Sequence, residues 1–92
     1  MPSDKIKQYS KEIFNKLIYI RREIHKYPEL GFQEFKTSDT IKRFLEELGL
    51  NVINLAGTGL VTTLYGKGSG RTIALRADID ALPIKEENTF DY

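Results

Sequence analysis

The segment Thr72–Pro83 constrains this chain more than any other. It reads Thr-Ile-Ala-Leu-Arg-Ala-Asp-Ile-Asp-Ala-Leu-Pro, so a mostly apolar run leads into two aspartates and is stopped by a proline. Such a run predicts a strand over Thr72–Ala77 that is covered on both faces. Because side chains two apart on a strand point the same way, Asp78 and Asp80 are predicted to face one site, where they could hold or support a metal ion.

The two aspartates also allow other interpretations. One of them could cap a turn while the other pairs with Arg76 or Lys85. Asp-x-Asp after an apolar strand also occurs in haloacid dehalogenases, where the first aspartate accepts a phosphoryl group. That family has a glycine or small residue and then a threonine after the motif, whereas Ala81-Leu82-Pro83 follows here, which argues against it.

Composition excludes several classes of function. The chain has 92 residues, a formal net charge of +1, no cysteine and one histidine. This length allows one small domain, and the balanced charge predicts binding neither to nucleic acid nor to membrane surfaces. Disulfides, thiolate metal sites and a multi-histidine zinc site are excluded within these residues. With no signal-peptide pattern at the start and no membrane-spanning run, we expect a cytoplasmic protein.

Two amphipathic helices are predicted first. Apolar residues recur every three or four positions over Asp4–Lys26, and Pro28 ends that helix. A second apolar stripe predicts a helix over Glu34–Leu48, with Gly49 as its left-handed C-terminal cap.

Three strands are predicted next. Asn51–Leu55 and Leu60–Tyr65 are joined by a glycine turn, and the loop Gly66–Gly70 is expected to bring Thr72–Ala77 back beside the second strand. The fold class is therefore α/β, with two N-terminal helices followed by three strands of a mixed sheet. Nothing after the third strand is predicted to cover its far side, so the chain is expected to be the beginning of a larger domain.

The remaining candidate residues favour structural roles. The clusters Gly57–Gly59 and Gly66–Gly70 lack the context of phosphate-binding loops and are predicted to be turns. His25 lies in the last turn of the first helix, where it would interact with the helix dipole or the last carbonyls. Glu29 and Glu34 are expected to fix the loop and start the second helix rather than act as acid or base.

Three blocks of the sequence carry a family resemblance: Arg21–Glu34, Gly57–Val61 and Gly70–Pro83. In their order and at similar separations they resemble the M20 metallopeptidases, and Glu86 and Glu87 also fit. The similarity is greatest to the amidohydrolase branch, which contains aminoacylase, hippurate hydrolase and the auxin-conjugate hydrolases.

This resemblance implies a fold and a reaction. The fold would be a zinc-exopeptidase-like catalytic domain, of which residues 1–92 are the N-terminal part without the later metal-ligand blocks and the dimerisation domain. The reaction would be hydrolysis of an N-acyl amino acid to a carboxylate and an amino acid. Two divalent metal ions (zinc, manganese, cobalt or nickel) would polarise the amide and bind the attacking water, with a glutamate as general base. The complete protein would be a homodimer or homotetramer.

The resemblance also assigns the two aspartates. Asp78 matches a metal-ligand position and Asp80 matches the aspartate that supports a ligand from behind, so both are the catalytic candidates. Since most ligands are expected in a later block, the 92-residue chain is predicted to bind no metal and to be inactive alone. Two alternatives stay open: a non-catalytic truncated remnant, and an M20 deacetylase or carboxypeptidase with another substrate class.

Overall fold

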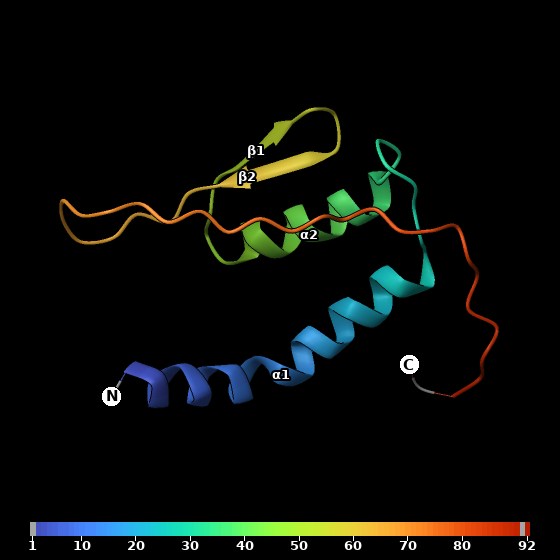
Figure 1. Ribbon diagram of the computed structural model, residues 1–92, viewed down its shortest axis with the longest axis horizontal. Helices are drawn as coiled ribbons and strands as arrows, with labels where there is room; N and C mark the ends of the chain where they lie inside the picture. Colours follow the sequence, from blue (N-terminus) through green and yellow to red (C-terminus); the bar gives the residue numbers. More distant parts are fainter. Residues whose placement is uncertain (1, 91) are drawn as a thin grey trace. The chain divides into compact units, whose positions relative to one another are not determined.

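Four elements make up the fold. The computed structural model describes residues 2–90 and 92, with α1 (Pro2–Lys26), α2 (Phe35–Glu47), β1 (Val52–Leu55) and β2 (Gly59–Thr62) in chain order (Figure 1). The chain divides into two units. One comprises Met1–Tyr27 with Lys85–Tyr92, and the other comprises Pro28–Ile84.

Helix α1 confirms the first predicted helix and begins at Pro2. A proline suits this position because its missing amide and fixed φ cost nothing in the first turn. Asp4 lies in the first turn, and His25 and Lys26 lie in the last, so both ends carry charges that suit the helix dipole. The apolar stripe of α1 is largely exposed. Neither helix of the described residues has the length and apolar character that a membrane crossing requires.

Helix α2 confirms the second predicted helix to within one residue at each end, and it stops where Gly49 was expected to cap it. Gly49 has φ of 83°, a left-handed conformation that glycine adopts without a Cβ penalty. Its amide donates to the Glu46 carbonyl (2.9 Å), and the Leu50 amide donates to the Leu45 carbonyl (3.2 Å). These two bonds form a Schellman motif, which satisfies carbonyls that the helix end leaves unpaired.

Strands β1 and β2 form an antiparallel hairpin in which Val52 pairs with Thr62 and Leu55 with Gly59. The first two predicted strands are thus confirmed, although β2 starts at Gly59 and ends at Thr62 rather than Tyr65. Helix α2 contacts both strands. This support matters because a two-stranded hairpin is marginally stable by itself.

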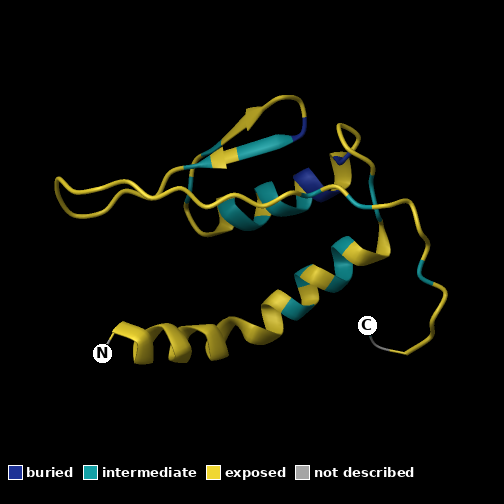
Figure 2. Ribbon diagram, viewed as in Figure 1, coloured by how far each residue is buried: buried dark blue, intermediate teal, exposed yellow. Residues whose placement is uncertain are grey.

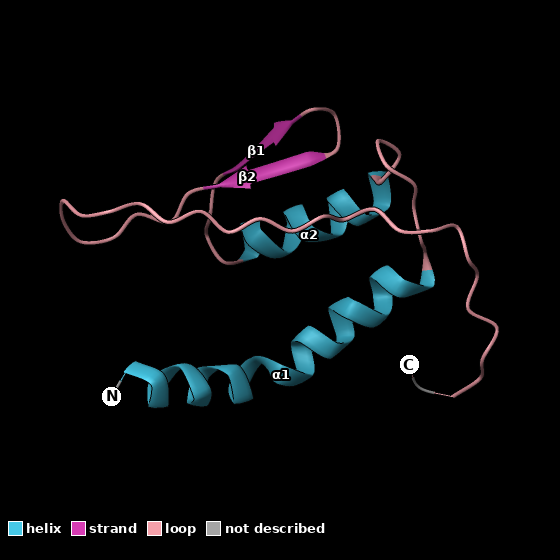
Figure 3. Cartoon of the chain, viewed as in Figure 1, coloured by secondary structure: helices cyan, strands magenta, loops and turns pink. Residues whose placement is uncertain are grey.

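The α/β class is confirmed, but the third strand predicted over Thr72–Ala77 is not: the sheet of the described residues consists of β1 and β2 alone, paired antiparallel rather than mixed. Beyond Thr62, the described residues contain no helix or strand (Figure 3). A strand exists only through pairing with a neighbour, and the residues after the Gly66–Gly70 loop do not pair with β2. Ile73 and Leu75 are consequently 84% and 96% exposed.

The most enclosed side chains are polar. Among the described residues no hydrophobic side chain is buried, whereas Glu34, Thr37, Ser38 and Thr58 are (Figure 2). All four lie in the unit Pro28–Ile84, at the start of α2 and in the hairpin loop. Together with Glu29 they form what we call the polar cluster.

Candidate functional site

Glu29 caps α2 from outside the helix. Its carboxylate accepts hydrogen bonds from the amides of Lys36 (3.0 Å) and Thr37 (2.6 Å), which lie in the first turn and have no partner within the helix. Glu34 occupies the N-cap position but makes no capping bond with its side chain. The prediction that Glu29 helps to start this helix is confirmed.

The contacts of Glu29 lower the pKa of its carboxyl group. Burial alone would raise this pKa, but hydrogen bonds from the Thr37 side chain and from the Lys36 and Thr37 amides outweigh that effect and hold the pKa below its ordinary value of 4.5. Hydrogen bonds to an ionised carboxylate favour the charged form. Glu29 is therefore an anion at neutral pH.

Acid is expected to weaken α2. Because the folded-state pKa of Glu29 lies below its unfolded value, its contribution to stability is complete above about pH 4.5 and is lost as the pH falls through the lower folded-state value. Helicity followed by circular dichroism should therefore fall more steeply below pH 4.5 in the native chain than in Glu29→Gln, which has no charge to lose. Superimposable acid transitions would contradict this role of Glu29.

Glu34 joins α2 to the hairpin loop. The Thr58 hydroxyl donates to its carboxylate at 3.0 Å, and both residues are buried. The sequence predicted a structural role for Glu34 but gave no partner, because the two residues are far apart in the chain. A buried carboxylate without such a donor would be costly, so the bond fixes the loop against the start of α2.

A third segment reaches the same place through the main chain. The Ala81 amide donates to the Glu29 carbonyl at 2.8 Å. Glu29 and Glu34 belong to the first sequence block that carries the family resemblance, Thr58 to the second and Ala81 to the third. Three blocks that are distant in sequence therefore meet at the polar cluster, and no local pattern in the sequence indicated this.

The two aspartates predicted to form the site are exposed. Asp78 Oδ1 lies 2.8 Å from Nη2 of Arg76, with the two side chains 67% and 86% exposed, so the pair contributes little stability. This is the pairing that the alternative interpretation of the sequence proposed. Within residues 2–90 and 92, no three or more histidine, aspartate or glutamate side chains gather as a metal site. The described residues thus do not form the implied metal centre by themselves.

His25 has a partner that the sequence did not indicate. It lies in the last turn of α1, as expected for a residue near the helix dipole, but its Nε2 is 2.9 Å from Oε1 of Glu86. The hydrogen bond from His25 is the main cause of a lowered pKa for the Glu86 carboxyl group, opposed by burial and assisted by Asn88. This contact ties the C-terminal segment to α1 within one unit.

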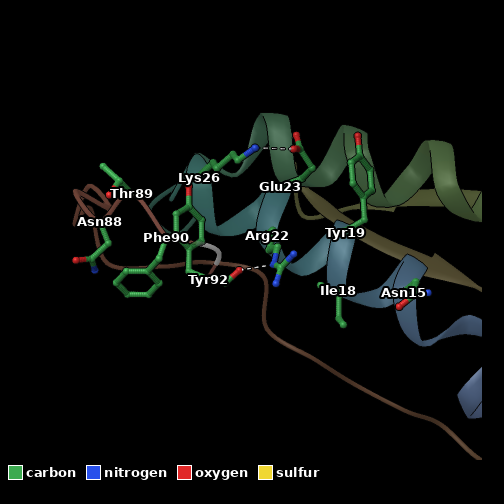
Figure 4. Close-up of a pocket in the computed structure, with 10 residues that line it drawn as sticks. All are labelled: Asn15, Ile18, Tyr19, Arg22, Glu23, Lys26, Asn88, Thr89, Phe90 and Tyr92. Atoms are coloured by element: carbon green, nitrogen blue, oxygen red, sulfur yellow. Dashed lines mark hydrogen bonds and ion pairs between the residues drawn. The ribbon is translucent and has the colours of Figure 1, made fainter.

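A hollow of about 590 Å³ is lined by residues of α1 and of the C-terminal segment, which belong to the same unit (Figure 4). In it, Arg22 Nε donates to the Tyr92 main-chain oxygen at 2.6 Å, and Lys26 Nζ lies 3.2 Å from Glu23 Oε1. The hydrogen bond and charge of Glu23 raise the pKa of the Lys26 ammonium. Arg22 Nε and Lys26 Nζ thus each have a partner within the chain itself. The other lining residues are Asn15, Ile18, Tyr19, Asn88, Thr89 and Phe90.

Comparison with known proteins gives several hydrolases. Thermostable carboxypeptidase 1 of Saccharolobus solfataricus is 44% identical over an alignment of 93 positions, which covers 97% of this chain and 23% of that protein. An N-acyl-L-amino acid amidohydrolase of Geobacillus stearothermophilus is 41% identical, and the alignment covers 100% of this chain and 25% of that protein. The N-acetylcysteine deacetylase of Bacillus subtilis is 40% identical, and the alignment covers 89% of this chain and 22% of that protein. No protein-family model and no solved structure matches the chain.

The coverage of these matches is one-sided. Nearly all of this chain aligns with each relative, yet the chain spans only about a quarter of the relatives' length, in their N-terminal part. The identities of 40–44% extend over the three blocks described above and agree with the resemblance that those blocks carry. The matches are consistent with the M20 amidohydrolases that the three blocks resemble, and the chain corresponds to the N-terminal part of the hydrolases it matches.

Proposed function

We propose that these residues are the front part of a metal-dependent amidohydrolase that converts an N-acyl amino acid and water into a carboxylate and a free amino acid. The observation that carries this proposal is the match of nearly the whole chain to hydrolases. The names of two of them specify a substrate with an acyl group on the nitrogen of an amino acid. Asp78 and Asp80 are the residues that this part of the protein contributes to the reaction.

The remaining metal ligands would come from the rest of the whole protein. In the described residues, Asp78 is paired with Arg76 and both side chains are mostly exposed, an arrangement too open to hold a catalytic metal, which needs several protein ligands. We therefore propose that the 92-residue chain alone does not hydrolyse N-acyl amino acids.

In the whole protein, Thr72–Ala77 would become a strand of a zinc-exopeptidase-like sheet. The side chains of Ile73 and Leu75 are almost fully exposed. Burying their apolar surface would favour folding by roughly 25 cal/mol for each Å² removed from water. A partner strand and a covering helix would supply both that burial and the missing main-chain bonds. The aspartates would then stand at the end of a paired strand, which holds them more precisely than a loop.

The proposal is tested by assaying the whole protein that carries these residues. N-acetyl and longer N-acyl amino acids are the first substrates, and release of the free amino acid is the readout. Peptides with a free C-terminus test a carboxypeptidase, the second candidate, which the 44% identical relative favours. The proposal would be contradicted if the whole protein hydrolysed neither class of substrate. It would also be contradicted if the purified 92-residue chain hydrolysed N-acyl amino acids.

Metal removal should abolish the activity of the whole protein. Dialysis against a chelator is expected to lower the rate of N-acyl amino acid hydrolysis to background, since metal ions would supply the polarisation of the amide and the nucleophile. Adding back zinc, manganese, cobalt or nickel one at a time should restore it and identify the preferred metal. Full activity in a protein shown to be metal-free by elemental analysis would contradict metal dependence.

A further inference from the structure

We propose that Glu29 is a positioning residue for the Asp78–Asp80 segment. Its side chain is fixed at the start of α2, and its main-chain carbonyl holds the residue that follows Asp80. The side chain and the main-chain carbonyl of Glu29 thus connect the beginning of α2 to the predicted site. The inference rests on the proposed function only in giving Asp80 a role in the reaction.

The side chain of Glu29 is held on both oxygens. Oε2 accepts from the Lys36 amide and Oε1 from the Thr37 amide, so the carboxylate cannot rotate without losing one of the two bonds. The positive end of the α2 dipole further favours an anion at this place. The backbone of Glu29 therefore has a defined position relative to α2.

The carbonyl of Glu29 transmits this position to the third sequence block. It accepts from the Ala81 amide at 2.8 Å, a good length for a main-chain hydrogen bond. Among the main-chain bonds between described residues outside the helices and the hairpin, this one alone joins the stretch after Thr62 to the rest of its unit. Asp80, which directly precedes Ala81, has no other main-chain anchor of this kind.

The contacts of the aspartates themselves do not provide such an anchor. The ion pair of Asp78 with Arg76 lies within the same segment and is mostly exposed, so it moves with the segment. The bond to Ala81 is different because its acceptor belongs to a residue that α2 holds. Loss of the Glu29 carboxylate should therefore release Asp80 and Ala81 together, even though neither touches that carboxylate.

The test is amide exchange in the 92-residue chain, measured residue by residue by NMR. Glu29→Ala removes the cap, and Arg43→Gly is the matched control. Arg43 is an exposed α2 residue whose side chain pairs only with Asp39 among the ion pairs of the described residues, and a glycine there weakens the helix by an amount similar to loss of a cap. We expect the Ala81 amide to exchange roughly fivefold faster in Glu29→Ala and at the native rate in Arg43→Gly. Glu29→Gln, which keeps one acceptor oxygen, should recover part of the protection.

Each other result overturns the inference. An Ala81 amide that is unprotected in the native chain would show that the bond to Glu29 is not formed. Equal exchange rates of the Ala81 amide in the native chain and in Glu29→Ala would show that the cap does not hold the segment. Equal acceleration of that exchange in Arg43→Gly would show that Glu29 only stabilises α2 in general. Because no metal or substrate takes part, these results are independent of whether the whole protein proves to be an amidohydrolase.

Discussion

Replacing Asp80 with asparagine is expected to lower kcat/KM of the whole protein for N-acyl amino acids by roughly 10- to 100-fold, the usual effect of removing a carboxylate that supports a metal ligand. Asparagine has nearly the same size but carries no charge. The metal ligand that Asp80 is proposed to support would therefore lose basicity and orientation. The variant should also bind its metal more weakly, which metal titration would measure.

Asp39→Asn is the matched control for this experiment. Asp39 is an exposed α2 aspartate that pairs with Arg43 at 2.8 Å, four residues along the same helix, and such a pair is worth a few tenths of a kcal/mol. Its removal should leave kcat/KM unchanged. If Asp80→Asn were as active as Asp39→Asn, with the same metal content, Asp80 would have no part in the reaction.

Replacing Gly59 with valine is expected to destroy the hairpin. A Cβ at this position would lie 2.5 Å from the carbonyl oxygen of Leu55, the residue with which Gly59 pairs across the two strands. Because the opposing atom is main chain, the strain can be relieved only by moving β1 away from β2. Overpacking of this kind typically costs about 1–3 kcal/mol. Cross-strand NOEs between β1 and β2 should be lost.

Gly66→Ala provides the comparison for the Gly59 variant. It adds a Cβ to a glycine of the following loop that has no atom within 4 Å, so NOEs between β1 and β2 should remain. The steric argument would be wrong if Gly59→Val kept those NOEs, or if Gly66→Ala lost them as well.

What the sequence predicted correctly depends on neighbours in the chain. The helical period of α1 and α2, the proline after the first helix and Gly49 after the second are local signals, and both helices end where these signals lie. The hairpin β1–β2 was predicted for the same reason, since its turn lies between two short runs rich in apolar and β-branched residues.

What the sequence did not predict depends on distant partners. The run Thr72–Ala77 has the composition of a buried strand, but composition cannot supply the neighbour that a strand needs, and the run is unpaired. The polar cluster was missed for the same reason. Nothing near Glu34 in the sequence points to Thr58, and nothing near Glu29 points to Ala81. The roles of Asp78 and Asp80 in a reaction stay predictions, because the residues that would complete their site are not among those described.

The long separation between bonded partners in the polar cluster implies an order of folding. Closing a loop costs entropy that grows with its length, by about 0.6 kcal/mol for each doubling. The hairpin and the first turn of α2 need only short loops, whereas the Glu34–Thr58 bond spans 24 positions and the Glu29–Ala81 bond spans a longer stretch. Ala81 should therefore join last, after the helix cap already holds Glu29. The segment with the two aspartates would then dock onto a preformed acceptor, late in folding.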